Sequence, residues 1–310
     1  MKKNILFYLL ATISLSIILS TKSYAAIFTL PSNGDSVVGK VKWTHSKQGD
    51  NFSIIGRHYD VGYFEMVEAN PGVDPSLPKP GTIVVIPTKF IIPNVPHVGL
   101  VLNVAEMRAY YFPPGSNKVM TYPVGIGRSA DWATPVGVTR IISKVKNPTW
   151  IPPEDIRKWH RATFGNDLPA KIGPGPDNPL GYYVLHLGKG FPEVYFHGTN
   201  EPASVGRRTS SGCIHLWPED IEDLYYRVKV GTPVRVINDP YKAGWLDNKI
   251  YLESHVPLEE QQDIYSKDLA PMRYDVQAVV ANRAVNIDWD EANRIADQQN
   301  GVPQVVGAAQ

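Results

Sequence analysis

Apolar residues along most of this chain come in short runs, and turn-forming residues separate these runs. Beyond residue 97 the runs are rich in β-branched and aromatic residues, and proline, glycine and asparagine stand between them. Runs of this kind predict strands, and their spacing is typical of a β-sandwich or β-barrel. The expected strands cover residues 98–103, 108–112, 119–124, 136–146, 182–187, 194–196 and 232–237.

A helical pattern interrupts the strands after Leu216. Pro218 suits the first turn of a helix, and the acidic residues behind it favour the positive end of the helix dipole. Apolar residues then recur at the helical spacing, at Ile221, Leu224, Tyr225 and Val228. Gly231 ends this pattern. With a helical turn over 154–160 and a helix over 289–298, the chain is predicted to be α+β and mainly β.

A smaller unit precedes these strands, over residues 37–88. After an extended leader, two short helical patterns begin at Phe52 and Phe64. Pro71-Gly72 stops the second, and a proline-rich loop leads to an apolar strand over 82–87. A strand, two helices and a strand in about fifty residues make a module with a minimal core.

The remaining segments are expected to connect units or to end the chain. A stiff linker is predicted from the prolines of residues 89–97. The tail is predicted to have one strand near 250–253 and an unstructured end. The expected organisation is a signal peptide (1–25), the small unit (37–88), the linker (89–97), the large domain (98–238) and a C-terminal extension (239–310).

The first 25 residues predict export. Lys2 and Lys3 precede an apolar run over 5–19, and Ser23 and Ala25 match the −3 and −1 positions of a cleavage site. The run is short for a transmembrane span, although an uncleaved anchor remains the alternative. No cysteine stands directly after the expected cleavage site, which argues against a bacterial lipid anchor.

Composition and charge exclude one class of partner. The chain has 310 residues, of which 43% are hydrophobic and 20% charged, so it can form two or three domains with ordinary cores. Without the three lysines of residues 1–25, 28 basic residues face 30 acidic ones, and the net charge is about −2. Nucleic-acid binding needs a basic face, so no nucleic-acid partner is expected.

Cys213 is the only cysteine, and it follows His197 by 16 residues in a segment crowded with glycine, serine and threonine. An exported chain with one cysteine forms no internal disulfide, so the thiol is free or pairs with another molecule. A thiol and an imidazole are the minimum apparatus of thiol nucleophilic catalysis. The alternative is that Cys213 is a small buried apolar residue.

The motifs around these two residues resemble those of the L,D-transpeptidase (YkuD-type) catalytic domain. The matching blocks are HGT at 197–199, SSGCIHL at 210–216, PVGIG at 123–127, TPVG at 134–137, NPTWIP at 147–152 and GPDNPLG at 175–181. They cover residues 98–238, and the tail over 245–258 resembles an extension found in the periplasmic Gram-negative subgroup. The resemblance implies a periplasmic protein associated with the cell wall.

The resemblance also implies a reaction, acyl transfer at peptidoglycan stem peptides. Cys213 would attack the carbonyl at the L-centre of diaminopimelate in a tetrapeptide, release D-alanine and form a thioester. His197 would be the base, with its ring oriented by the Gly198 carbonyl. The acceptor would be the amine of another stem peptide, giving a 3–3 cross-link, or an amine on an outer-membrane protein. No metal or cofactor is implied, and inactivation by carbapenems is expected.

Other site residues follow from the same resemblance. The backbone N–H groups of Gly212 and Cys213, with Ser211 nearby, would stabilise the oxyanion. Tyr195, Thr199 and His215 are expected to contact substrate, although packing is the alternative role for Tyr195.

Two positions depart from the family pattern. Ser211 stands where the family often has histidine, and His215 stands where it has arginine. Because His215 lies two residues from Cys213 in an extended segment, it points to the same side and could compete with His197 for the thiol. A histidine would also hold a substrate carboxylate more weakly than an arginine, and in a pH-dependent way.

The small unit resembles a lysin-motif (LysM) module. The matching blocks are GD at 49–50, II at 54–55, EANPG at 68–72, LPKPG at 77–81 and IP at 86–87. This resemblance implies binding of glycans that contain N-acetylglucosamine, and the alternative is a structural domain without a ligand.

Three other functions remain as alternatives. Water as the acceptor would make the protein an L,D-carboxypeptidase. A thiol hydrolase of the NlpC/P60 type is disfavoured because there the cysteine precedes its histidine. A non-catalytic wall-binding protein would use the lysin motif alone. A zinc peptidase is disfavoured because the chain has no HExxH motif.

Overall fold

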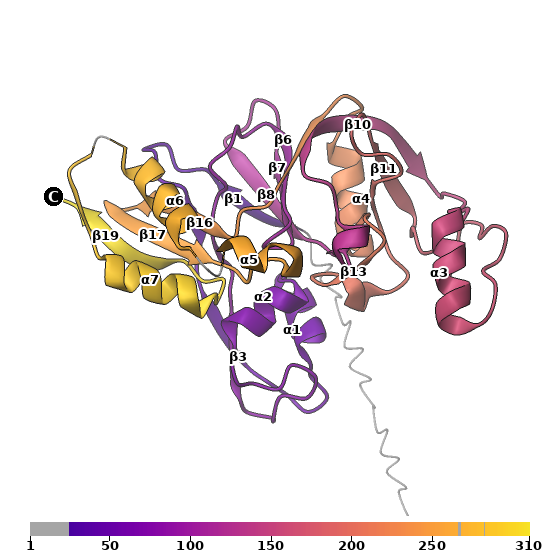
Figure 1. Cartoon of the computed structure of the whole chain (residues 1–310), viewed down its shortest axis with the longest axis horizontal. Helices are drawn as coiled ribbons and strands as arrows, with labels where there is room; N and C mark the ends of the chain where they lie inside the picture. Colours follow the sequence, from indigo (N-terminus) through magenta and orange to yellow (C-terminus); the bar gives the residue numbers. More distant parts are fainter. Residues whose placement is uncertain (1–24, 266–267, 282) are drawn as a thin grey trace, which may run out of the picture.

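The computed structural model describes residues 25–265, 268–281 and 283–310 (Figure 1). The predicted signal peptide lies outside these ranges except for its last residue, Ala25. Among the described residues, none of the helices has the length and apolar character needed to cross a bilayer.

Strands are the most frequent regular elements of the described residues. They are β1 (Ala26–Thr29), β2 (Val37–Gly39), β3 (Lys42–His45), β4 (Ile83–Ile86), β5 (Lys89–Ile91), β6 (Gly99–Asn103), β7 (Arg108–Phe112), β8 (Lys118–Pro123), β9 (Ile126–Gly127), β10 (Gly137–Lys146), β11 (Tyr183–Leu187), β12 (Tyr195–His197), β13 (Arg208–Ser210), β14 (Ile214–His215), β15 (Pro233–Ile237), β16 (Tyr241–Leu246), β17 (Lys249–Ser254), β18 (Val285–Ile287) and β19 (Gln304–Ala309).

The helices are fewer and lie between groups of strands. The α-helices are α1 (Phe52–Tyr59), α2 (Tyr63–Ala69), α3 (Glu154–Phe164), α4 (Pro218–Arg227), α5 (Gln262–Tyr265), α6 (Ala270–Val280) and α7 (Trp289–Gln298), and the 3-10 helices are η1 (Ala130–Trp132), η2 (Pro202–Ser204) and η3 (Glu259–Gln261). The prediction of a mainly β chain is therefore confirmed.

The main sheet has nine strands in the order β1-β8-β7-β6-β15-β10-β11-β12-β14. It curls around a core to which α4 contributes Ile221 and Leu224, both fully buried. Helix α4 begins where its sequence predicts, with proline at its first position and acidic residues in its first turn, and it ends at Arg227, before the predicted end at Gly231. The curl brings the two short strands β12 and β14 to one end of the sheet, next to each other.

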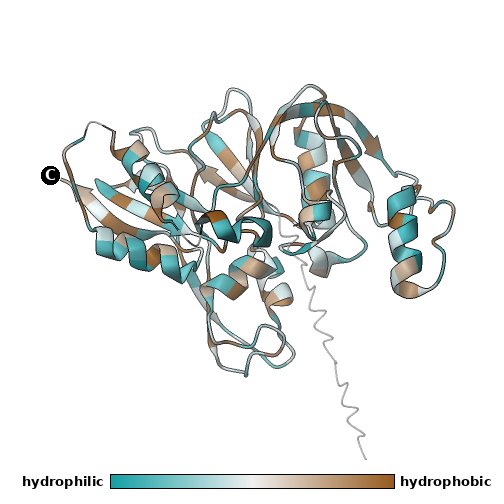
Figure 2. Cartoon of the chain, in the orientation of Figure 1, coloured by the Kyte–Doolittle hydropathy of each residue, from teal (hydrophilic) through white to brown (hydrophobic). Residues whose placement is uncertain are grey.

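The C-terminal extension departs from its prediction. Strands β16 to β19 form a sheet of their own, and α6 and α7 pack on it around Trp245, Ile250 and Ile295. Figure 2 shows hydrophilic residues along the outer side of α7, whose opposite side is buried. Helix α7 has its predicted bounds, but the predicted unstructured end is wrong because Gln304–Ala309 is a strand between β17 and β18.

The small unit consists of β3, α1, α2 and β4 in that order, with β3 and β4 antiparallel. Asn51 begins α1 by accepting a hydrogen bond from the Ile54 N–H at 2.9 Å, as polar N-cap residues do. Phe52, Met66 and Ile86 are among the buried residues of its core. Only the later part of the predicted linker is free of regular structure, because its first residues form β5, which pairs with β2.

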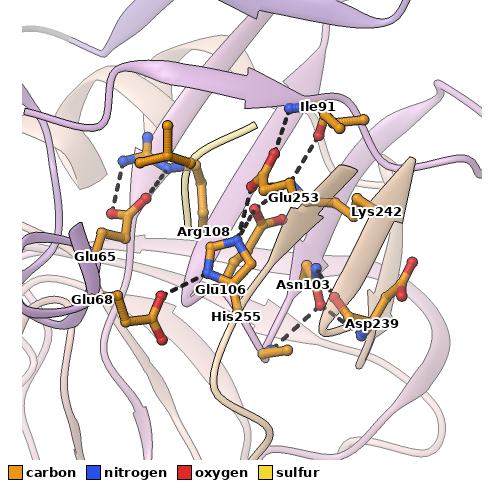
Figure 3. A network of polar contacts seen from close by, with 12 residues as sticks. Glu65, Glu68, Ile91, Asn103, Glu106, Arg108, Asp239, Lys242, Glu253 and His255 are labelled. Carbon is orange, nitrogen blue, oxygen red and sulfur yellow. Dashed lines mark hydrogen bonds and ion pairs between the residues drawn. The ribbon is translucent and has the colours of Figure 1, made fainter. Parts of the chain in front are cut away.

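A buried network of charges joins three parts of the chain (Figure 3). Lys242 of β16 donates to Glu106 at 2.5 Å and to Glu253 at 2.8 Å, and all three side chains are fully buried. His255 contacts Glu253 at 2.8 Å and Glu68 of α2 at 2.9 Å. Although burial alone would lower it, the two carboxylates raise the pKa of His255 to about 10. The network therefore holds the small unit, the main sheet and the C-terminal extension together.

Candidate active site

The pairing of β12 with β14 determines which side chains can meet. The two strands are parallel, with Phe196 opposite Ile214 and His197 opposite His215. Phe196 and Ile214 are fully buried in the core. Because successive side chains of a strand alternate between its faces, His197 and His215 lie on the other face. Tyr195 and Cys213, each two residues earlier, are placed on that face too.

His197 is held in one tautomer. Its Nδ1 lies 2.6 Å from the carbonyl oxygen of Gly198, and since a carbonyl can only accept, Nδ1 carries the proton. Nε2 therefore has a free lone pair in the neutral ring. The residue is 3% exposed, and this burial lowers its pKa to about 4 despite the opposing effect of the Gly198 carbonyl. The imidazole is neutral at pH 7 and suited to accept a proton at Nε2.

The position of the Gly198 carbonyl depends on the loop that the sequence marks with GPDNPLG. Buried Asn178 donates to the carbonyl of Pro148 at 2.8 Å and accepts from the Leu180 N–H at 2.9 Å. Gly181 then lies against Gly198, so close that a Cβ on Gly181 would come within 2.9 Å of the Gly198 Cα. Only glycine permits this contact. The loop thus supports the turn that orients His197.

Cys213 is partly exposed, and its thiol donates to the carbonyl oxygen of Glu193 at 3.5 Å. Removal of the thiol from water raises its pKa to about 11, and a backbone hydrogen bond from Tyr195 acts in the opposite direction. In the described part of the chain no hydrogen bond joins the thiol to His197. The resting site therefore pairs a neutral thiol with a neutral imidazole.

This protonation state predicts the pH dependence of thiol reactivity. Only the thiolate reacts with iodoacetamide, and at a pKa of about 11 its fraction rises about tenfold per pH unit through neutrality. We expect the rate of alkylation of Cys213, followed by intact mass, to rise steadily from pH 6 to pH 9. A plateau that starts below pH 7 would instead reveal a thiolate–imidazolium pair and contradict the prediction.

The backbone before the thiol is fixed by Ser210 and Thr134. The Ser210 hydroxyl donates to the Cys213 carbonyl at 2.6 Å and accepts from the Gly212 N–H at 3.1 Å. The Thr134 hydroxyl donates to the Gly212 carbonyl at 3.0 Å and accepts from the Gly127 N–H. Gly212 has a φ of +103°, which favours glycine. The Gly212 N–H, expected as an oxyanion donor, is therefore already bonded to Ser210.

His215 lies beside His197, with 4.7 Å between the ring centroids. Its Nδ1 is 3.1 Å from the Ser204 hydroxyl. Burial, and then the neighbouring His197, hold the pKa of His215 well below its usual value. It is therefore a neutral group, and in the described residues it has no hydrogen bond to the thiol.

The other predicted residues lie around this centre in different ways. Thr199 is buried, and its hydroxyl accepts from the Glu201 N–H at 2.8 Å. Tyr195 stacks on His186 with 4.4 Å between ring centroids, and Ser211 is partly exposed. Sequence reasoning missed the roles of Ser210 and Thr134, although both stand inside the quoted motifs.

One cluster has the donor types of a metal site. Glu106, Glu253 and His255 are buried and place one ligand atom each within 4.8 Å of one another. The ammonium of Lys242 already contacts both carboxylates. We therefore interpret the cluster as an ion network, formed by residues that lie far from Cys213 in the sequence.

Comparison with known proteins places these features in a family. Residues 97–236 match the YkuD L,D-transpeptidase catalytic domain. The chain is 37% identical to "Probable L,D-transpeptidase YcfS" of Escherichia coli K12, over 94% of this chain and 92% of that protein. It is 35% identical to "Probable L,D-transpeptidase YbiS" of the same strain, over 90% and 91%. An L,D-transpeptidase structure from Mycobacterium smegmatis aligns over 50% of this chain and 63% of that one, with 19% identity and a TM-score of 0.34.

Proposed function

This chain belongs to the L,D-transpeptidase family, whose YkuD-type catalytic domain it contains, and we propose that Cys213 is the nucleophile and His197 the base of its acyl transfer. The chain is thus an acyltransferase that acts on peptidoglycan. The observation that supports these two roles is the fixed tautomer of His197, which presents an unprotonated Nε2 on the face shared with the only thiol.

In the proposed acylation, the Cys213 thiol turns from the Glu193 carbonyl toward Nε2 of His197 and gives up its proton. Sulfur attacks the carbonyl that links diaminopimelate to the terminal D-alanine, and a carbon–sulfur bond forms. The carbon–nitrogen bond breaks, His197 returns the proton to the leaving amine, and D-alanine departs. A thioester remains on Cys213.

In the proposed second step, an amine attacks the thioester carbonyl, a carbon–nitrogen bond forms and His197 removes the proton of the amine. The carbon–sulfur bond breaks, and His197 returns the proton to the departing sulfur, which regenerates the Cys213 thiol. The Cys213 N–H is the proposed oxyanion donor, because the Gly212 N–H is bonded to Ser210. Its peptide plane is fixed by the Thr134 hydroxyl on the Gly212 carbonyl, and a donor held in advance is worth most in such a site. The acceptor is a stem-peptide amine or an amine on an outer-membrane protein, and water would give a carboxypeptidase instead.

Intact mass spectrometry tests this proposal. Purified residues 26–310 are mixed briefly with a tetrapeptide muropeptide and quenched in acid. The expected product is a protein heavier by the donor minus D-alanine, with the added mass on the Cys213 peptide. Unmodified protein, an unchanged muropeptide and retained binding to sacculi would contradict the proposal and favour a wall-binding protein without catalysis. Adding carbapenem to a parallel sample should also modify Cys213.

We further propose that the small unit is a lysin motif that holds glycan strands near the thiol. A groove of about 400 Å³ supports this role. It is lined on one side by Asn51, Ser53, Ile54, Arg57, Tyr63, Pro75 and Ser76 of the small unit and on the other by Pro202, Ala203 and Arg207. Since η2 contains Pro202 and the His215 partner Ser204, a glycan in the groove would lie against the loop that borders the active site. Such tethering raises the local donor concentration.

A surface variant tests the glycan groove. Ile54 is 54% exposed at the groove, and Ile54→Asp should weaken binding to purified sacculi by about tenfold because an apolar contact is replaced by a charge. Acylation by a soluble muropeptide should not change. Ile264→Asp, at a similarly exposed isoleucine outside the groove, is the matched control. Equal sacculus binding by both variants and the unmodified protein would refute the assignment.

A further inference from the structure

The Arg128 side chain contacts two aromatic rings and, among the described residues, no carboxylate. Its guanidinium lies over the ring of Trp132 at 4.6 Å and over the ring of Trp159 at 3.9 Å. Nη2 is buried and has no hydrogen-bond partner. Within the described residues the guanidinium forms no salt bridge with any carboxylate. A buried donor without a partner is uncommon and calls for a functional explanation.

This arginine is tied to the segment that carries the thiol. The Arg128 N–H donates to the carbonyl of Ser210 at 3.0 Å. The carbonyl oxygen of Trp132 lies 3.7 Å from the position that a Cβ on Gly212 would occupy. The two residues therefore flank the backbone immediately before Cys213. Trp159 approaches from α3, which stands beyond β10 and β11 at the edge of the molecule (Figure 1).

The other cationic groups near this segment are already engaged. Arg208 of β13 forms a two-pronged pair with Glu260 at 2.9 and 3.0 Å. Arg207 donates to the Ala203 carbonyl and lies on the Tyr63 ring. His215 is partly exposed, lies beside His197, and is bonded to Ser204. Of these three arginines, and within the described residues, Arg128 is the one whose guanidinium has neither a carboxylate nor a carbonyl partner.

We propose that Arg128 binds a carboxylate of the stem peptide. This inference rests on the proposed function. The rings of Trp132 and Trp159 lie against the guanidinium and restrict its orientation. A guanidinium edge matches a carboxylate with two parallel hydrogen bonds, and the partnerless Nη2 is the donor that such a carboxylate would satisfy. Contact with Trp159 also links carboxylate binding to the position of α3.

Three carboxylates of the tetrapeptide donor share this chemistry, and matched donors distinguish them. One donor carries an amide in place of the α-carboxylate of the D-glutamyl residue, a second carries it in place of the D-centre carboxylate of diaminopimelate, and a third carries it at the terminal D-alanine. The second-order acylation rate is measured by intact mass for the natural donor and for each amide, with the unmodified protein, Arg128→Gln and Arg128→Lys. Alkylation by neutral iodoacetamide reports thiol reactivity in parallel.

We expect the unmodified protein to prefer the natural donor over one of the amides by about 10- to 100-fold, as a charged hydrogen bond allows. Arg128→Gln should lose most of that preference at unchanged alkylation, and Arg128→Lys should keep part of it. The control Arg273→Gln removes an arginine that lies over Trp289 in the C-terminal extension and should keep the full preference.

The outcomes separate this inference from the proposed function. Acylation of the unmodified protein with the same donor preference in Arg128→Gln would overturn the role of Arg128 alone. Absence of acylation in the unmodified protein would overturn the proposed function and this inference with it. Loss of alkylation together with acylation in Arg128→Gln, restored in neither respect by Arg128→Lys, would show a purely structural arginine and overturn the inference.

Discussion

Cys213→Ala is expected to form no acyl-enzyme with a tetrapeptide donor, and this is the largest single effect that the structure predicts. The chain contains one thiol, and the nearby Ser210 hydroxyl is committed to backbone contacts with Gly212 and the Cys213 carbonyl. No other group can form the thioester. The measurement is intact mass after mixing with muropeptide, under conditions that modify the unmodified protein completely.

His197→Gln is expected to slow acylation about 100- to 10,000-fold, which is the usual contribution of a general base. The glutamine side chain can keep the hydrogen bond to the Gly198 carbonyl but cannot take up the thiol proton. His215→Gln is the informative comparison because its ring lies 4.7 Å from that of His197 on the same face. If His215→Gln were slowed as strongly and His197→Gln only slightly, the base would be His215.

The residues of the site could be found in the sequence because they lie close together along the chain. The segment 195–216 contains the proposed base, the thiol and the glycine before it, and extended backbone on both sides fixes which side chains share a face. What the sequence could not show is the partner of each group. The sequence alone suggests the Gly212 N–H as an oxyanion donor. In the structure this N–H instead donates to the Ser210 hydroxyl, two residues away.

The other contacts that the sequence did not reveal join residues that lie far apart in the chain. Thr134 lies 78 residues from Gly212, and Arg128 approaches the thiol segment through the backbone of Ser210. Strand β19 is rich in glycine and alanine, and its pairing with β17 joins segments about fifty residues apart. Local hydrophobic pattern carries no information about such partners. The sequence therefore predicted only one strand of the C-terminal sheet, near 250–253, whereas helix α7 was predicted with its bounds because its own cap and periodicity define it.

The buried network of Figure 3 could not be predicted either, yet the fold depends on it. Lys242 is the cation that Glu106 and Glu253 share, and it also donates to the Ile91 carbonyl at 2.8 Å. Burial disfavours the charged ammonium, but the two carboxylates more than compensate and raise the pKa of Lys242. Each charged side chain of this network is therefore stable in the buried state only while its ion-pair partners are present.

Lys242→Met is accordingly expected to destabilise the protein by about 3–5 kcal/mol, the usual cost of removing one partner of a buried ion pair. The methionine can fill the space of the lysine stem, but it leaves Glu106 and Glu253 close together with only His255 as a cation. The measurement is the free energy of unfolding from urea denaturation. Lys158→Met, which removes an exposed lysine paired with Glu154 at 3.9 Å, is the control and should have almost no effect.

The pH dependence of the same variant gives a second, independent check. Without Lys242 the facing carboxylates should have pKa values in the folded state above those in the unfolded state. A group shifted in this direction costs no stability at low pH, where both states bind its proton, and costs most above the folded pKa. The deficit of Lys242→Met should therefore be smaller at pH 5 than at pH 8. A deficit that does not change with pH would show that the lysine acts through packing, and that the three parts of the chain are not held together by charge.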